Sequence, residues 1–115
     1  MSVGPQCGEV WLLDEASVLP GGMLALVVSG PLYNAARPRR MVVEVVTEAL
    51  PAAGALLAPL PERLAQLGVA VIGEPMTVPV GWFPGDGEPI ATLTADEIDA
   101  ITDALRSLIG RLPWR

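Results

Sequence analysis

The chain has 115 residues, of which 51% are hydrophobic and 17% are charged, and its formal net charge is −6. This length is enough for one hydrophobic core and too short for two, so we expect a single domain spanning residues 1–115. All of the cationic side chains are arginines, since the sequence contains no lysine and no histidine. The composition therefore excludes catalysis by histidine, and the acidic balance excludes long-range attraction of nucleic acid.

Signals for membranes, export and metals are weak or missing in this sequence. The longest apolar stretches, residues 23–28 and 52–60, are well short of the roughly 20 residues needed to cross a bilayer. Residues 1–8 lack the basic start and the apolar run of a signal peptide, so we expect a cytoplasmic protein that makes no membrane contact. Cys7 is the only cysteine. We therefore expect no disulfide, no bound metal and no cofactor.

The apolar fraction is high for a chain of this size. A small monomer has too little interior to bury so many apolar side chains, and the excess favours a surface covered by a second copy. We expect a symmetric homodimer whose interface is built from strands and from a helix over residues 94–110.

The first half of the chain alternates short apolar runs with turn residues, a pattern that predicts strands. Residues 9–13 form the first predicted strand, and residues 14–22 form a turn. Residues 23–29 are a continuous apolar run and predict a buried central strand. Residues 30–39 are expected to be a loop, and the valine-rich segment 40–48 a third strand.

The second half predicts short strands followed by one helix. We expect a fourth strand over residues 54–57, a helical turn over 61–67, and two strands over 69–72 and 76–82 separated by Gly73-Glu74-Pro75. Thr94 and Glu97 have the spacing of a capping box, which predicts a helix beginning there. Its apolar side chains recur at three- and four-residue spacing, and Gly110 is placed to end it.

Five segments, taken in order, resemble one known family. They are residues 8–14 (GEVWLLD), 25–29 (ALVVS), 31–34 (PLYN), 42–47 (VVEVVT) and the helix over 94–110. Their order and spacing resemble the MazF/PemK toxins of toxin–antitoxin systems, which belong to the CcdB-like superfamily. The resemblance implies a mainly β fold, a small SH3-like β-barrel with one C-terminal helix, that forms a homodimer and binds a cognate antitoxin. It also implies metal-independent cleavage of single-stranded RNA.

The resemblance further implies two catalytic positions. The family opens its second strand with an Arg-Pro pair, and that arginine acts with a threonine that ends the third strand. The threonine falls on Thr47, whereas the arginine falls on Met23 and the proline on Leu24. Loss of one charged donor to the transition state commonly lowers the rate by about a hundredfold to a thousandfold. We therefore expect the endoribonuclease activity to be weakened or lost.

Three further features have both a functional and an ordinary interpretation. Arg37, Arg39 and Arg40 form the only cationic cluster, which either binds RNA phosphates or is a solvated loop. Thr47 is either a phosphate ligand or a plain strand residue. Trp11 is expected in the core. Trp82, Phe83 and Trp114 either pack, in the core or at a dimer contact, or stack on RNA bases.

Two functions follow from these observations. The first is a toxin of a type II toxin–antitoxin module, an endoribonuclease by resemblance, with impaired chemistry at Met23. The alternative is a non-catalytic dimeric binder of the same fold, either a CcdB-like gyrase poison or a degenerate toxin. The tail over residues 112–115 (LPWR) is similar to the tryptophan-containing C-terminus of CcdB toxins.

Overall fold

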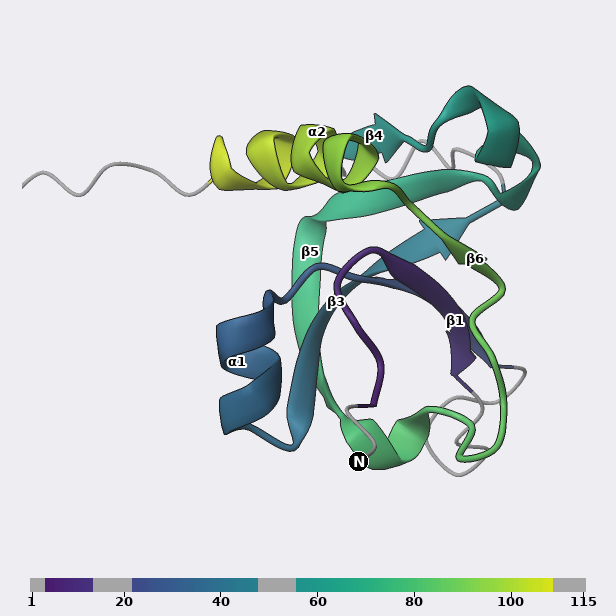
Figure 1. Cartoon of the computed structure of the whole chain (residues 1–115). Helices are drawn as coiled ribbons and strands as arrows, with labels where there is room; N and C mark the ends of the chain where they lie inside the picture. Colours follow the sequence, from purple (N-terminus) through teal and green to yellow (C-terminus); the bar gives the residue numbers. More distant parts are fainter. Residues whose placement is uncertain (1–3, 14–21, 48–55, 109–115) are drawn as a thin grey trace, which may run out of the picture.

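The computed structural model of the chain describes residues 4–13, 22–47 and 56–108. The elements follow one another as β1 (Glu9–Leu13), β2 (Met23–Val27), α1 (Pro31–Ala36), β3 (Arg39–Val46), β4 (Leu57–Pro59), the 3-10 helix η1 (Glu62–Leu67), β5 (Val69–Pro79), the 3-10 helix η2 (Val80–Trp82), β6 (Ala91–Thr92) and α2 (Ala95–Arg106) (Figure 1). Over the described residues, no helix has the length and apolar character required to cross a membrane.

The six strands form one antiparallel sheet in the order β4-β5-β3-β2-β1-β6. The sheet bends round on itself as a barrel does, but β4 and β6, its two edge strands, are not paired with each other in the described part of the chain (Figure 1). The expected fold class, mainly β with one C-terminal helix, is therefore confirmed. The barrel is an open one.

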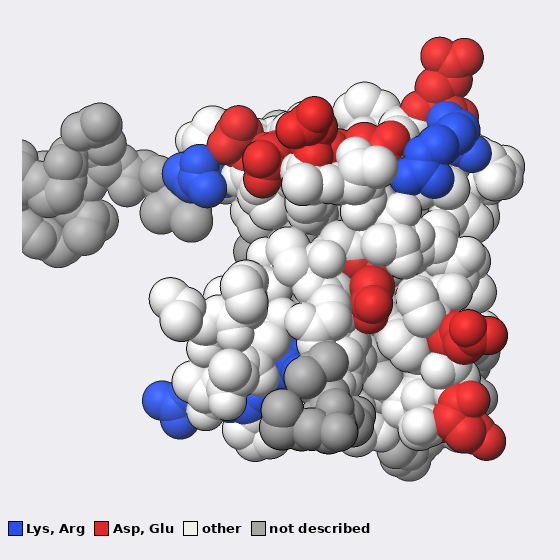
Figure 2. Space-filling model, in the orientation of Figure 1, with Lys and Arg blue, Asp and Glu red and all other residues white. Residues whose placement is uncertain are grey.

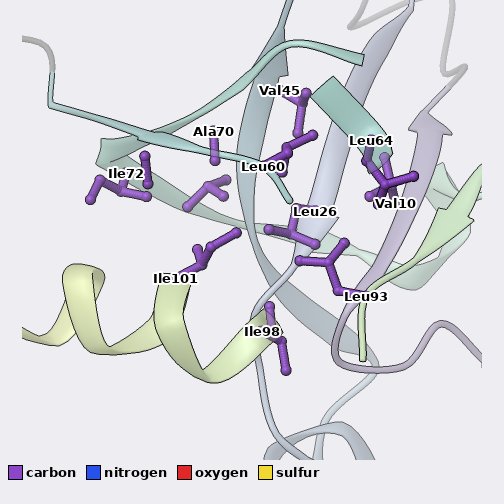
Figure 3. Packing of buried hydrophobic residues seen from close by; sticks show 12 residues of the cluster. Val10, Leu26, Val45, Leu60, Leu64, Ala70, Ile72, Leu93, Ile98 and Ile101 are labelled. Carbon is purple, nitrogen blue, oxygen red and sulfur yellow. The ribbon is translucent and has the colours of Figure 1, made fainter. Parts of the chain in front are cut away.

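The sheet has a hydrophobic cluster on each face. Val42 and Val43 are adjacent in β3 and both are fully buried, yet they belong to different clusters. Because successive side chains of a strand point to opposite faces, the sheet must be covered on both. α2 covers the first cluster (Figure 3), which comprises Val10, Leu26, Val43, Val45, Ala58, Leu60, Leu64, Ala70, Ile72, Leu93, Ile98 and Ile101. The second cluster comprises Trp11, Leu13, Met23, Ala25, Val27, Val42, Val78 and Phe83.

Helix α2 begins as the sequence predicted. The Glu97 N–H donates to Thr94 Oγ1 at 3.2 Å, and the Thr94 N–H donates to Glu97 Oε1 at 2.8 Å, so the capping box is complete. Ile98 and Ile101 point from the helix into the first cluster (Figure 3). The helix ends at Arg106; the last two residues of the predicted helix, 109 and 110, lie outside the described residues.

Two predicted elements were wrong. Residues 30–39 were expected to be a loop, but they contain the six-residue helix α1, which starts at Pro31 and is held by Asn34, whose amide donates to the Ser29 carbonyl at 2.9 Å. Residues 69–72 and 76–82 were expected to be two strands, but β5 is continuous to Pro79. Both of its parts pair with β3, and the Gly73-Glu74-Pro75 segment takes up a shift of register between them.

Smaller differences have local causes. β2 ends at Val27 because the N–H groups of Val28 and Ser29 both donate to the Met41 carbonyl, which interrupts the ladder. The predicted 54–57 strand is observed as Leu57–Pro59, and the predicted helical turn at 61–67 is the 3-10 helix η1. The two-residue strand β6 was missed. Most of the predicted turn at 14–22 and the tail at 112–115 lie outside the described residues.

Arg63 bridges the two edges of the open sheet. It lies in η1, directly after β4, and donates from Nη2 to the Thr92 carbonyl of β6 at 3.0 Å. The same guanidinium contacts both carboxylate oxygens of Glu97 in α2, at 2.6 Å and 3.2 Å. This forked contact therefore ties β4 and η1 to β6 and the start of α2.

We expect the Arg63–Glu97 contact to make stability depend on pH. The hydrogen bond from Arg63, and after it the Thr94 N–H, lowers the pKa of the Glu97 carboxyl. A lowered pKa in the folded state adds stability that is complete above the ordinary carboxyl pKa and is lost as the pH falls through the lowered value. The difference in melting temperature between the wild type and Glu97→Gln should therefore be largest at neutral pH and shrink in acid. The control is Glu62→Gln, which removes an exposed carboxylate of η1. A difference in melting temperature between the wild type and Glu97→Gln that is the same at every pH would contradict the expectation.

Candidate functional site

Met23 opens β2 and is almost buried. Its side chain is 8% exposed and packs in the second cluster, and its backbone lies opposite Leu13 of β1. The apolar environment explains why a long, uncharged and flexible side chain fits here. The position to which the resemblance assigns an arginine is therefore occupied by a core methionine.

Thr47 follows directly after β3 and is exposed. Val46 pairs with Val69 of β5, so Gly68 lies beside the Val46–Thr47 peptide. Gly68 has a φ of +118°, and a Cβ at this position would lie 1.8 Å from the Val46 carbonyl oxygen and 2.9 Å from Thr47 Cα. Only glycine allows the two backbones to approach so closely, and this approach fixes where Thr47 leaves the sheet.

The structure brings Met23 and Thr47 to the same end of the β2–β3 pair. The ladder between these strands runs from Val27–Val42 to Ala25–Glu44 and stops there. Met23 lies two residues before Ala25, and Thr47 lies three residues after Glu44, so both flank the open end of the ladder. Glu44 is half-exposed, and its side chain lies on the same face of the sheet as those of Ala25 and Met23. The charged side chain that this part of β3 places on that face is therefore a carboxylate.

The three clustered arginines lie at the other end of β3. Arg39 and Arg40 begin the strand, and Arg37 directly follows α1. Along the strand, the eight residue-to-residue steps from Arg39 to Thr47 span roughly 26 Å. The structure therefore does not bring the cationic cluster together with Met23 and Thr47 in one chain.

Arg40 differs from its two neighbours because its side chain is only 3% exposed. Its Nε donates to the Pro5 carbonyl at 2.7 Å, and its Nη1 donates to the carbonyls of Arg39 at 2.7 Å and Arg37 at 3.2 Å. Burial lowers the pKa of the guanidinium, which nevertheless stays charged. Arg40 thus holds the N-terminal segment against the start of β3, while Arg37 and Arg39 are exposed.

Among the five arginines of the described residues, two others are already engaged. Arg63 is paired with Glu97, and Arg106 with Asp103 at 2.8 Å. Arg37 and Arg39 are therefore the exposed arginines outside ion pairs in the described part of the chain. Within these same residues, no arginine takes the place of the one that the resemblance assigns to position 23.

The aromatic side chains of the sheet are packed together. Trp11 is buried and lies edge-on against Phe83, with ring centroids 5.8 Å apart and an angle of 87°, while Trp82 packs against the same cluster. Packing is therefore confirmed for Trp11 and Phe83, which are buried, whereas Trp82 is only half-buried and base stacking by its ring stays a prediction.

A metal site was not expected from the sequence. Within the described residues, no group of three or more His, Cys, Asp and Glu side chains is arranged to hold a metal ion.

The sequence interpretation missed a buried polar pair and a glycine. The hydroxyl of Ser29 donates to Asn34 Oδ1 at 2.6 Å and accepts from the Met41 N–H at 3.1 Å, which joins the end of β2, α1 and β3. The sequence signal for the Ser29–Asn34 pair was weak: Ser29 ends an apolar run, and Asn34 follows five residues later. Gly68 stood between a predicted helical turn and a strand, which did not reveal its contact with Thr47.

Solved structures of other proteins share this arrangement of strands and helices. A MazE-MazF structure from Deinococcus radiodurans matches with a TM-score of 0.71 and 23% identity, over 95% of this chain and 98% of that chain. An endoribonuclease from a mycobacterial species matches with a TM-score of 0.70 and 19% identity, over 97% and 96%. The chain has the MazF fold. The resemblance found in the sequence is thereby confirmed at the level of the fold.

A further solved structure with the MazF fold is a mycobacterial endoribonuclease in complex with its cognate antitoxin, with a TM-score of 0.68 and 21% identity over 96% of this chain and 99% of that chain. No protein-family model and no curated protein sequence matches the chain. The likeness to the MazF fold therefore resides in the three-dimensional arrangement. Chemistry within a shared fold depends on the individual side chains of the site.

Proposed function

We propose that this chain is the toxin component of a two-protein toxin–antitoxin module in the cytoplasm, with the RNA-cleaving chemistry of the family weakened or lost. The MazF fold over nearly the whole chain supports the toxin assignment. The observation that supports the weakened or lost chemistry is the burial of Met23, whose apolar side chain lies beside the open end of the β2–β3 ladder that Thr47 also flanks.

The proposed loss follows from what RNA cleavage needs. Attack of a ribose 2′-hydroxyl on the adjacent phosphate requires a base, an acid and a positive donor for the charge that develops on phosphorus. The exposed Thr47 hydroxyl can donate a hydrogen bond to a phosphate oxygen, but it supplies no charge. Glu44, the ionisable group on the same stretch of β3, would repel the phosphate rather than stabilise it.

A second candidate is a non-catalytic binder of the same fold, such as a gyrase poison or a degenerate toxin. The burial of Met23 favours it, because the side chain packs among the apolar residues of the second cluster. The tail at residues 112–115, which suggested a CcdB-like mode of action, lies outside the described residues.

The proposed partners are a second copy of the chain and a cognate antitoxin. Support comes from the neighbouring structures, one of which is a complex of an endoribonuclease with its cognate antitoxin. RNA binding by Arg37, Arg39 and Arg40 stays a prediction. The burial of Arg40 limits its direct contacts, so we expect Arg37 and Arg39 to account for any RNA affinity of this cluster.

The toxin assignment predicts a stable complex with the product of a neighbouring short reading frame. We expect the two proteins, expressed together, to purify as one complex, and the melting temperature of this chain to rise when the partner is added because the partner binds only the folded state. The measurement is size-exclusion chromatography with light scattering, followed by thermal unfolding. Independent elution of the two proteins would contradict the toxin assignment and favour a binder that acts alone.

A further inference from the structure

Part of the sheet is uncovered on the face of the second cluster, where β3, β5 and β4 run side by side. Glu44 of β3 pairs with Val71 of β5, and Val71 pairs with Leu57 of β4. Two residues further along β3, Val46 pairs with Val69. Partners across a ladder project to the same face of a sheet, so these five side chains form one continuous surface. We call it the valine face.

The valine face begins where the second cluster ends. Glu44 alternates with Val42 of that cluster along β3 and pairs with Ala25, another of its members. Val42 and Ala25 are fully buried, whereas the apolar side chains of the valine face are half-buried or less and belong to neither cluster of the described residues. Met76, which pairs with Val42, is 37% exposed and continues the apolar surface. Partly exposed apolar side chains that adjoin one another in this way mark a surface for a partner.

A carboxylate lies in the middle of this apolar surface. Ala25 and Val71 flank Glu44 across the strands, and Val42 and Val46 flank it along β3. In the described part of the chain, the Glu44 carboxylate has neither a hydrogen bond nor an ion pair. Covering a carboxylate without giving it a partner is strongly unfavourable. An occupant of the valine face must therefore bring a cation or a hydrogen-bond donor to Glu44.

The surroundings of Glu44 favour protein over RNA as the source of that group. Sites for single-stranded RNA combine a basic groove with aromatic side chains on which the bases stack. The valine face has neither, because its apolar side chains are aliphatic and the exposed Arg37 and Arg39 lie at the other end of β3. Figure 2 shows one side of the molecule, where acidic side chains gather along α2 and would also repel RNA. Aliphatic surface around one carboxylate instead matches a protein segment that carries an arginine or a lysine among apolar side chains.

The spacing of the valine face restricts this segment. Neighbouring strands lie about 5 Å apart, so Val71 and Leu57 are roughly 5 and 10 Å from Glu44 across the sheet. Val46 is two residues from Glu44 and therefore about 7 Å from it along β3. In an extended segment, the apolar side chains must accordingly lie within about three residues of the cation.

We propose that the valine face binds one segment of the protein partner of this toxin, with an arginine or a lysine of that segment on the Glu44 carboxylate. The inference rests on the proposed function and specifies the chemistry of the partner at the same end of the β2–β3 ladder. An arginine at position 23 would favour an acidic segment there. This chain has the apolar Met23 and the carboxylate of Glu44 on that face, so it selects a basic segment.

Exchanges on the valine face test the proposal. The probe is the product of the neighbouring short reading frame, and its affinity for the full chain is measured by isothermal titration calorimetry. Glu44→Gln should weaken binding at least about tenfold, because it removes the charge, and Glu44→Arg at least about a hundredfold, because it opposes two cations. Val71→Thr, which places a hydroxyl in the apolar surface, should weaken binding about threefold or more. Glu88→Gln, which removes an exposed carboxylate before β6, is the matched control and should have no effect.

A charge exchange with the partner locates the cation. Each arginine and lysine of the probe is changed to glutamate in turn. One of these changes should weaken binding to the wild-type chain and return the affinity for Glu44→Arg to within about tenfold of the wild-type pair, since the two charges are then exchanged across the contact. Thermal unfolding of each variant verifies that it is folded.

The outcomes separate this inference from the toxin assignment. Absence of any complex with the probe contradicts the proposed function, and the inference with it. A complex that is insensitive to Glu44→Gln and Glu44→Arg, or that no charge exchange restores, leaves the toxin assignment intact and overturns the inference. The inference is also overturned if Glu44→Gln weakens binding of a single-stranded RNA and leaves the affinity for the probe unchanged.

Discussion

Gly68→Ala is expected to destabilise the protein by at least about 3 kcal/mol. The methyl group would lie 1.8 Å from the Val46 carbonyl oxygen and 2.5 Å from its carbon, and both atoms belong to the backbone of a paired strand. The φ of +118° adds strain for any residue with a Cβ. β3 and β5 would have to separate at this point, so the melting temperature should fall by roughly 10 °C or more.

Gly81→Ala is the matched control for this exchange. Gly81 lies in η2, is exposed, and has no atom within 4 Å of the place that a Cβ would take. A change of less than about 1 kcal/mol is expected there. Equal melting temperatures for Gly68→Ala and Gly81→Ala would show that the close approach of Gly68 to Thr47 does not exist in solution.

The strands and the main helix could be predicted because their signals are local. β1 has the predicted bounds, and α2 begins at the predicted capping box, since both depend on residues next to one another in the chain. α1 could not be predicted in this way. Six residues carry too little periodicity, and the helix is held by the contact of Asn34 with Ser29 in a neighbouring element.

Contacts between distant residues explain the remaining differences. β5 continues through Gly73-Glu74-Pro75 because β3 offers a partner on both sides of that segment, which no local pattern reveals. From the sequence, Arg40 belonged with Arg37 and Arg39 in one cluster. Its burial depends on the Pro5 carbonyl, 35 residues away in sequence, so the cluster divides into one structural and two exposed arginines.

The candidate site was predictable only in part. The resemblance assigned Met23 and Thr47, and the structure places both at the open end of the β2–β3 ladder. It did not indicate that Gly68 fixes the backbone at Thr47, or that Met23 belongs to the second cluster. Because position 23 is buried, any charged side chain introduced there is expected to destabilise the fold as well as to change the chemistry.

Met23→Arg is expected to raise the rate of RNA cleavage by about a hundredfold or more over the native chain, which we expect to cleave at least about a hundredfold more slowly than a typical MazF toxin. The new guanidinium would supply the positive donor that the developing phosphorane charge requires, at the end of the β2–β3 ladder that Thr47 also flanks. The exchange should also destabilise the fold by about 1–3 kcal/mol, because Met23 is 8% exposed and its neighbours are apolar. The long side chain can reduce this penalty by extending past the end of the ladder toward solvent.

A single-turnover assay on a long unstructured RNA tests this expectation, with the thermal unfolding of each variant measured in parallel. Met23→Gln is the matched control: it places a polar side chain in the same apolar surroundings without a charge, so it should lose stability and gain no activity. Met23→Arg combined with Thr47→Ala should lose most of the gain, because the hydroxyl and the guanidinium are expected to act on the same phosphate. Cleavage by the native chain at the rate of a typical MazF toxin would contradict the assigned role of position 23. No cleavage by a folded Met23→Arg variant would instead favour the non-catalytic binder, in which Thr47 is a plain residue at the end of β3 and the MazF fold serves association alone.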